Sequence, residues 1–227
     1  MTENILREEK GILYEIMQEK DLEETATLLS KIFSSKEPVT KSLDITEEEF
    51  RYFAEIYCRK AVRDGLSVVA KDKSNKDKIV SFIISEDLDS EQPEGIEKVG
   101  PKILPLIALV DALEEDIKSN KKEGERRFHM FLGGTDKEYE NRHILTILNE
   151  ETMKLAKTKG FTSLVTEPSG FATQHIFKKF GFETRNMIEY KTFLYEGKNV
   201  FKNIEGPVGI PLMEKSLMST ENKEEKR

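Results

Sequence analysis

Tryptophan is absent from this chain of 227 residues, and cysteine occurs once, as Cys58. A single cysteine cannot form an internal disulfide. Cys58 lies in "FRYFAEIYCRKAV", where apolar residues recur at helical spacing, so a packed thiol is expected there rather than a nucleophile. Such sparing use of cysteine is typical of a reducing, intracellular compartment, and we expect the protein in the cytoplasm.

Long hydrophobic runs are also lacking. The longest, "ILPLIALVDAL", is shorter than the roughly 18–20 apolar residues that a membrane-spanning helix needs. The first residues, "MTENILREEKG", are acidic and contain no apolar segment, so neither a signal peptide nor a transit peptide is expected. The sequence therefore predicts no membrane partner.

Positive charge is not in excess, because the formal net charge is −7. This balance disfavours binding of the whole surface to nucleic acid or to an anionic membrane. The basic stretch "NKKEGERR" is interrupted by glutamates, which is typical of a solvated loop. We therefore expect no nucleic-acid partner.

Two kinds of catalytic motif are missing as well. The three histidines, His129, His143 and His175, have no metal-ligand spacing with the cysteine or with carboxylates, so no metal is expected. A nucleophile elbow of the form G-x-S-x-G is absent, which argues against serine hydrolase chemistry.

The first half of the chain contains clear element signals. Pro38 is expected to end the first helix; Thr46 and Gly65 are the expected N-cap and C-terminal stop of the second. Residues 73–77, "KSNKD", read as a hairpin turn between two strands. The expected elements are strand 12–18, helix 21–33, a helix after Thr46, strands 66–72 and 78–87, and an apolar helix within 101–119.

The second half alternates between strands and helices. The expected elements are strand 126–135, helix 141–159, strand 161–167, helix 171–180, and strand-like runs 187–197 and 209–217. The whole order is β-α-α-β-β-α-β-α-β-α-β-β, which predicts one α/β domain over residues 1–217. The charged residues 218–227 are expected to form a solvated tail.

Several stretches together resemble a known superfamily. The turn "GGTDKEYENRHIL", the strand "GFTSLVTE" and the helix "ATQHIFKKFGFE" are similar to the acyl-CoA-binding core of the GNAT N-acetyltransferases. Nearer the N-terminus, Phe33 followed by Glu37 and Pro38 resembles the opening of the arylalkylamine-type enzymes. The resemblance extends over roughly residues 10 to 217, without a single decisive motif.

This resemblance implies a fold and a reaction. The implied fold is a mixed, mostly antiparallel sheet of about seven strands flanked by helices, with strands four and five splayed apart. The implied reaction transfers an acetyl group from acetyl-CoA, as co-substrate, to a small amine.

The resemblance also implies where acetyl-CoA lies. Its arm runs along the strand end "FLGGT", with Gly133, Gly134 and Thr135, where the glycines allow a bulge or a close backbone approach; a plain strand-to-loop junction is the alternative. Its pyrophosphate lies at the start of the following helix. The implied contacts there are Asn141, Arg142, His143, Ile144 and Leu145.

The phosphate turn departs from the superfamily pattern, which would be Arg/Gln-x-x-Gly-x-Gly/Ala. Here it reads "ENRHIL", so Glu140 replaces the basic or amide residue, and His143 and Leu145 replace the small ones. Side chains at those two positions narrow the approach of a phosphate, whereas Arg142 and His143 can donate to it. Two interpretations stay open: the loop still binds pyrophosphate, or it only begins a helix.

Glu37 is the implied catalytic base, which removes the proton of the amine. The alternative is an exposed glutamate before a proline. Phe177 occupies the place where many GNAT enzymes have a tyrosine that protonates the leaving thiolate, and we include it among the residues near the cofactor. Ser169 and Thr173 are nearby hydroxyl candidates, unless they only cap and cover the helix.

Two classes of function therefore remain. The first is an acetyl-CoA-dependent N-acetyltransferase. The second is an inactive GNAT-fold protein that serves as a structural or interaction subunit and has a protein partner. The second predicts a filled cofactor cleft, with Phe131, His143 or Phe177 in the path of the pantetheine arm.

Overall fold

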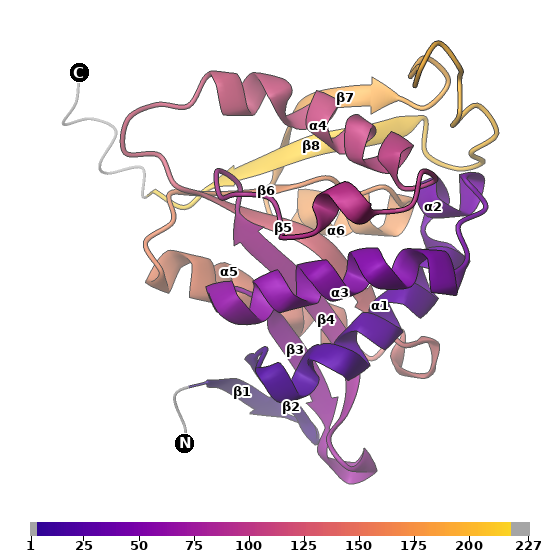
Figure 1. Cartoon of the computed structure of the whole chain (residues 1–227). Helices are drawn as coiled ribbons and strands as arrows, with labels where there is room; N and C mark the ends of the chain where they lie inside the picture. The colour runs from indigo at the N-terminus through magenta and orange to yellow at the C-terminus, as the bar shows by residue number, and fades with distance from the viewer. Residues whose placement is uncertain (1–3, 219–227) are drawn as a thin grey trace.

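All strands of the computed structural model, which describes residues 4–218, belong to one sheet (Figure 1). The sheet has eight strands in the order β1-β2-β3-β4-β5-β6-β8-β7. The strands are β1 (Ile5–Glu9), β2 (Ile12–Ile16), β3 (Val68–Asp72), β4 (Lys78–Asp87), β5 (Arg127–Thr135), β6 (Ser163–Thr166), β7 (Glu183–Glu189) and β8 (Gly209–Ser216).

Neighbouring strands run antiparallel except for β5 and β6, which are parallel. The sheet is thus mixed and mostly antiparallel, as predicted. It has one strand more than the seven expected, because residues 5–9 pair with β2 through a tight turn at Lys10 and Gly11, both with positive φ. The charged sequence of β1 does not alternate clearly, so pairing with β2 decides its structure.

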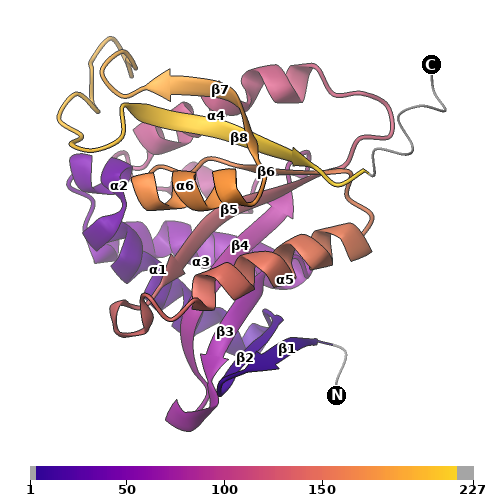
Figure 2. The same ribbon diagram turned by 180° about the vertical axis from the view of Figure 1, so that it is seen from behind.

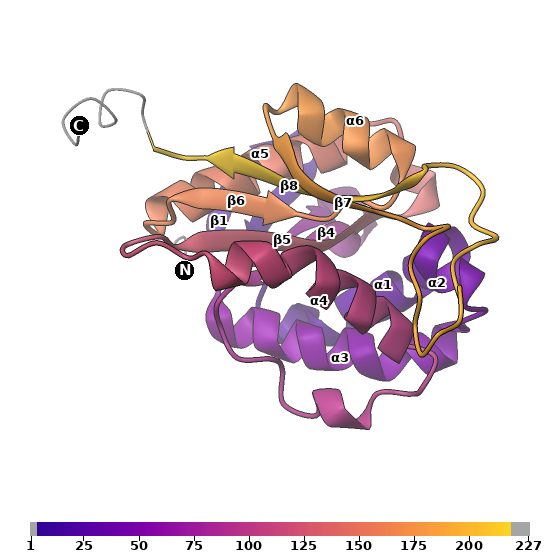
Figure 3. The ribbon, with the colours of Figure 1, turned by 90° about the horizontal axis from the view of Figure 1, so that it is seen from above.

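Helices cover both faces of the sheet (Figures 2 and 3). The helices are α1 (Leu22–Lys36), α2 (Pro38–Ser42), α3 (Glu47–Asp64), α4 (Leu104–Ser119), α5 (Ile144–Thr158) and α6 (Phe171–Lys179). Helices α1, α3 and α4 lie on one face, and α5 and α6 lie on the other. Each face has its own buried apolar cluster, so the sheet is packed on both sides.

The strongest local signals in the sequence are confirmed in α3. The Thr46 side chain accepts from the Glu49 N–H, and the Glu49 side chain accepts from the Thr46 N–H, which is a capping box. Gly65 ends the helix in the left-handed region, at φ 61°. Cys58 in this helix is fully buried, and burial raises the pKa of its thiol to about 12, so it is the packed thiol predicted.

One local prediction was confirmed but incomplete, and another was wrong. The first helix ends at Lys36, just before Pro38 as predicted, but Pro38 is also the first residue of the short helix α2, which was not predicted. Proline suits the first position of a helix because the N–H of that residue has no partner within the helix. The expected strand 187–197 is β7 at Glu183–Glu189, and it gives way to turns from Tyr190 onward.

Two further predictions concern membrane-spanning helices and the C-terminal tail. Within residues 4–218, no helix combines the length and the apolar character needed to cross a membrane. The predicted tail, except for its first residue, lies outside the described residues.

Candidate active site

Strands β5 and β6 separate part-way along their length. Their pairing extends from Arg127 opposite Ser163 to His129 opposite Val165. Beyond that point β6 ends at Thr166, whereas β5 continues to Thr135. This is the splay expected between the two central strands. The backbone edge of β5 that faces away from β4 is therefore available to a ligand along residues 131–134.

A cavity of about 400 Å³ opens where the two strands separate. Its walls come from α1, α2, α4, β5, α5 and α6, so it connects the start of α5 with the start of α2. Most of its wall is apolar, with Phe33, Leu106, Val110 and Ile176 among the lining side chains. A mostly apolar cavity with a few polar groups is the usual form of a small-molecule site.

The two glycines at the end of β5 have different surroundings, and neither forms the predicted bulge. The bulge lies at Phe131, because Met130 pairs with Ser85 while Leu132 pairs with Ile84. Gly133 lines the cavity. Gly134 instead faces α1, where a Cβ would come within 3.0 Å of Ile32. Close approach is therefore the role of Gly134, and the bulge is two residues earlier than the first glycine.

Thr135 turns away from the cavity. Its hydroxyl is 2.9 Å from the Ser81 hydroxyl, and both groups are buried. The same Ser81 hydroxyl donates to the Gly134 carbonyl at 2.8 Å. Of the three residues expected at the strand end, Gly133 alone lines the cavity.

The loop before α5 has an unusual backbone. Asn141 and His143 both have φ of 60°, in the left-handed region that favours glycine. His143 is the N-cap residue of α5, and its side chain makes no capping hydrogen bond. The first N–H groups of α5 are therefore not satisfied by a side-chain cap, and such groups bind anions.

The other loop residues lie at different depths. Leu145 lines the cavity, and Ile144 is buried in the apolar cluster beneath α5. Arg142 is exposed, with its guanidinium 4.8 Å from the centre of the Tyr139 ring. The expected phosphate contacts therefore flank the cavity rather than all lining it.

Glu140 forms an ion pair with Lys36 across the edge of the cavity. Lys36 comes from the end of α1, so the pair joins the two sides of the opening. Because Lys36 offsets the charge of Glu140, this glutamate repels a nearby phosphate less than its sequence position alone would indicate.

Glu37 lines the same cavity, next to Lys36 in the chain. It is the N-cap of α2, and its carboxylate accepts from the N–H of Val39 at 3.1 Å and of Thr40 at 2.6 Å. These two bonds hold the carboxylate in place. The Tyr190 hydroxyl is nearby: burial, and then the charge of Glu37, raise the pKa of Tyr190.

Phe177, Ser169 and Thr173 all line the cavity at α6. Phe177 packs edge to face against Phe182, with ring centres 5.0 Å apart. Thr173 donates its hydroxyl to the Gly170 carbonyl at 2.9 Å, and Gly170 is the N-cap of the helix. Ser169 is therefore not the cap, and its side chain forms no hydrogen bond with any residue of the described chain.

Asn149 is a polar cavity residue that the sequence did not reveal. Its side chain donates to the Leu145 carbonyl at 2.7 Å, and its Oδ1 atom is buried with no partner within residues 4–218. A buried acceptor without a donor favours a ligand that brings one, and the amide groups of a pantetheine arm do so. Together with the edge of β5 and the uncapped α5, this residue fits an acyl-CoA.

Comparison with known proteins identifies the architecture. No family model and no curated protein sequence matches the chain. Among solved structures, the C-terminal condensation domain of Ebony in complex with beta-alanyl-dopamine superposes with a TM-score of 0.81 at 17% identity, over 91% of this chain and 99% of that one. Arylalkylamine N-acetyltransferase 2 from Aedes aegypti superposes with a TM-score of 0.76 at 18% identity, over 92% and 100%. This chain has the GNAT fold.

A third structure with the GNAT fold is the Drosophila melanogaster polyamine N-acetyltransferase that forms N-acetylagmatine. Its TM-score is 0.73 at 18% identity, over 91% of this chain and 100% of that one. The resemblance to arylalkylamine-type enzymes is therefore confirmed at the level of the fold. Identities this low leave the activity to be argued from the site.

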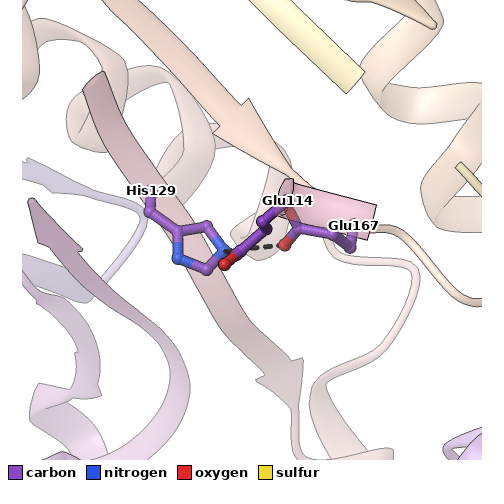
Figure 4. Close-up of side chains that lie close together, drawn as sticks. All are labelled: Glu114, His129 and Glu167. Carbon is purple, nitrogen blue, oxygen red and sulfur yellow. Dashed lines mark hydrogen bonds and ion pairs between the residues drawn. The ribbon is translucent and has the colours of Figure 1, made fainter. Parts of the chain in front are cut away.

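Beside the cavity of this GNAT fold lies a buried polar cluster that the sequence did not reveal (Figure 4). It contains His129 on β5, Glu86 on β4, Glu114 on α4 and Glu167 just after β6. His129 Nδ1 is 3.2 Å from Glu86, and its Nε2 is 2.6 Å from Glu167 and 3.5 Å from Glu114. Burial opposes protonation, but Glu167 and Glu114 outweigh it and raise the pKa of His129 well above its ordinary value.

One feature of the sequence could have located His129, though not its partners. Alternation along β5 places His129 on the face opposite Phe128 and Met130, so a polar side chain enters the apolar layer under α3 and α4. Its carboxylate partners come from three other segments of the chain. No spacing rule connects them, and only the fold brings them together.

Proposed function

We propose that the protein is an acetyl-CoA-dependent N-acetyltransferase that acts on a small amine. The observation that carries this proposal is one continuous cavity, which leads from the uncapped start of α5, past the free edge of β5, to the carboxylate of Glu37. A thioester arm and an amine enter such a cavity from opposite ends. The proposed location remains the cytoplasm.

The residues have distinct proposed roles. The N–H groups of Ile144 and Leu145 receive the phosphates, with Arg142 alongside, and Asn149 accepts from an amide of the arm. Gly133 and the bulge at Phe131 present the backbone edge to the arm. Phe177 forms the apolar wall beneath it.

The reaction starting from an ammonium ion requires three proton movements. Glu37 removes the first proton from the ammonium form of the acceptor, and the neutral nitrogen then attacks the thioester carbonyl carbon as the carbon–sulfur bond breaks. The nitrogen releases its second proton to solvent as the amide forms. The thiolate that leaves needs a proton. Ser169 is the better placed of the two hydroxyl groups, because Thr173 already donates to Gly170.

The acceptor is proposed from the relatives and the charge. The similar structures are described as enzymes or domains for arylalkylamines, agmatine and beta-alanyl-dopamine. A primary amine that is cationic in solution and partly apolar fits both the apolar wall and the net charge of −7.

The alternative, an inactive subunit with a protein partner, predicts a filled cleft. The cavity is open, and Phe131 packs against Tyr57 at a ring separation of 5.0 Å rather than across it. The open cavity supports the enzyme over the alternative.

The test is a calorimetric titration of the purified protein with acetyl-CoA, followed by an acetylation screen of primary amines. Binding at micromolar concentrations with turnover of at least one amine is the expected result. No heat at millimolar acetyl-CoA would overturn the proposal. Free CoA and dephospho-CoA are the comparison ligands, because they report the contributions of the acetyl group and of the ribose phosphate.

A further inference from the structure

The buried cluster beside the cavity has the composition of a metal site. Its three candidate ligands are His129, Glu114 and Glu167, whose ligand atoms all lie within 4.8 Å of one another. We propose that these three side chains bind one divalent transition-metal ion, with Zn²⁺ as the best match to a set of one imidazole and two carboxylates. This site is separate from the proposed acetyl-transfer residues and does not depend on them.

The distances suit an ion of this size. Zinc binds imidazole nitrogen and carboxylate oxygen at about 2.0–2.2 Å, which places tetrahedral ligand atoms roughly 3.3–3.6 Å apart. His129 Nε2 and Glu114 Oε1 are already 3.5 Å apart. His129 Nε2 and Glu167 Oε2 are 2.6 Å apart, so a small rotation of the Glu167 carboxylate opens the site.

Two carboxylate oxygens in the cluster are orphans. Glu114 Oε1 and Glu167 Oε1 are buried and have no hydrogen-bond partner within the described part of the chain. Both side chains are almost inaccessible, with 4% of Glu114 and 3% of Glu167 exposed. Buried acceptors are nearly always satisfied, so an unpartnered oxygen on each of the two carboxylates beside His129 favours a cation there.

A proton on His129 does not satisfy these oxygens. A protonated imidazole has two N–H groups, and Glu86 and Glu167 Oε2 already receive them. Glu114 Oε1 and Glu167 Oε1 still lack a partner. A metal ion differs because it interacts with Nε2 and with both carboxylates at the same time.

The surroundings of the ligands are those that metal sites use. Glu86 lies 3.2 Å from His129 Nδ1, which fixes the ring so that Nε2 faces the two other carboxylates. Lys60 lies 3.1 Å from Glu86, and Lys118 lies 2.6 Å from Glu114 Oε2, away from the proposed ion. Two of the three ligands, His129 and Glu114, are therefore each oriented by a further group.

The site has a route for entry. Glu167 lines the cavity, and the His129 and Glu114 side chains adjoin Glu167 without lining the cavity themselves. An ion that reaches Glu167 from the cavity meets the other two ligands directly. Its fourth position then faces the cavity, where water or a ligand can occupy it.

The test uses the full chain after treatment with a chelator and removal of the chelator. Zn²⁺ and, separately, Mn²⁺ are added without acetyl-CoA or amine, and bound metal is measured by elemental analysis after dialysis and by calorimetry. We expect one Zn²⁺ per chain, and a visible absorption spectrum of tetrahedral Co²⁺ after cobalt substitution.

Variants locate the site. His129→Gln and Glu167→Gln should each lower Zn²⁺ affinity at least 100-fold, and Glu86→Gln should lower it by about 10–100-fold because it only orients the ring. His143→Gln and His175→Gln are the matched controls, since both histidines are exposed, and they should bind as the wild type does. Circular dichroism of each variant checks that it is folded.

Two results would overturn the proposal. The first is a wild-type chain that retains no metal after dialysis against micromolar Zn²⁺. The second is unchanged affinity in Glu167→Gln, which sits at the cavity wall and leaves the histidine in place, so it remains informative if His129→Gln does not fold. Loss of acetylation has no bearing on either result, because no substrate is present.

Discussion

Glu37 has two tasks that compete for one carboxylate. As the N-cap of α2 it accepts from Val39 and Thr40, and as the proposed base it must also accept a proton from the amine. A carboxylate has about four lone-pair sites, so two N–H donors leave room for a substrate. The capping bonds aim the group and keep it beside the cavity.

Exchange of Glu37 for glutamine separates the two tasks. Glu37→Gln keeps one capping acceptor but cannot take a proton, so acetylation should fall at least 100-fold while acetyl-CoA affinity changes by only a few-fold. Loss of part of the cap should lower the free energy of unfolding by about 0.5–1 kcal/mol. Steady-state rates, calorimetry and urea denaturation measure the three effects.

Glu48→Gln is the control for Glu37→Gln. It removes an exposed carboxylate from the first turn of α3, away from the cavity, and should leave the rate unchanged. Full activity in Glu37→Gln would exclude Glu37 as the base.

His143 has a backbone conformation that is unfavourable for a residue with a side chain. Its φ of 60° costs a residue with a Cβ about 1–2 kcal/mol relative to glycine. His143→Gly should therefore raise the free energy of unfolding by up to about 1 kcal/mol and tighten acetyl-CoA binding, because the start of α5 becomes more accessible to phosphate. Denaturation and calorimetry are the measurements.

Asn141→Gly provides the matched comparison in the same loop. Asn141 has the same φ, but asparagine tolerates this region better and does not cap α5, so both gains should be smaller. Equal cofactor affinity in wild type and His143→Gly would show that the loop does not receive the phosphates.

At the scale of the element, β5 combines three features within a few residues: a split from β6, a bulge at Phe131 and two glycines. The bulge reverses the alternation of side chains, so Met130 packs on the α5 face while Leu132 packs under α1. Phe131, the extra residue, then lies at the cavity.

The two glycines of β5 should respond differently to alanine. Gly134→Ala brings a Cβ to 3.0 Å from the Ile32 side chain and 3.3 Å from the Phe82 ring, so these packed side chains must give way, and the free energy of unfolding should fall by about 1–3 kcal/mol. Gly133→Ala meets no atom closer than 3.6 Å and should leave stability within about 0.5 kcal/mol. Urea denaturation of both variants tests the difference, and equal losses would contradict it.

At the scale of the whole molecule, acidic residues in ion pairs join segments that are far apart in the sequence, such as the ends of β4 and β5. Asp89, after β4, pairs with the buried Arg127 of β5 at 2.5 Å and with Lys121 at 2.9 Å. Partial burial by itself would raise the pKa of Asp89. The hydrogen bonds from Lys121 and Arg127 outweigh burial and hold this pKa below its ordinary value. Burial would also raise the pKa of Asp136, but hydrogen bonds from Lys78 and from the Glu138 N–H lower it below its ordinary value.

These lowered pKa values predict the response to acid. The folded state binds fewer protons than the unfolded one, so the stabilisation is complete above the unfolded pKa of about 4 and is lost as the pH falls through the lower, folded value. The free energy of unfolding, measured by urea at a series of pH values, should decrease below about pH 4. Asp89→Asn should cost about 1–3 kcal/mol at pH 7 and make the acid decrease shallower.

Whether a feature of the structure could be predicted from the sequence depends on how far apart in the chain the interacting residues lie. Thr46 and Gly65 set the ends of α3 through contacts within one helical turn, and the sequence alone is enough to read them. Strand β1 was missed because its structure comes from pairing, and α2 because a proline can begin a helix as well as end one. For the candidate site, position 37 beside the cavity was predicted, whereas Asn149 and the His129 cluster were not.

By itself, the sequence determined most of the order of strands and helices, the caps of α3, and the loop without glycine before α5. Those properties follow from periodicity and from neighbours in the chain, which are local. The GNAT-like architecture was predicted from the resemblance to that superfamily. The tertiary structure alone decided that Lys36 offsets Glu140, that Glu37 is held by α2, and that one buried histidine meets three carboxylates. The reason is physical: these groups are many residues apart, and their charges interact only after the sheet has buried them together.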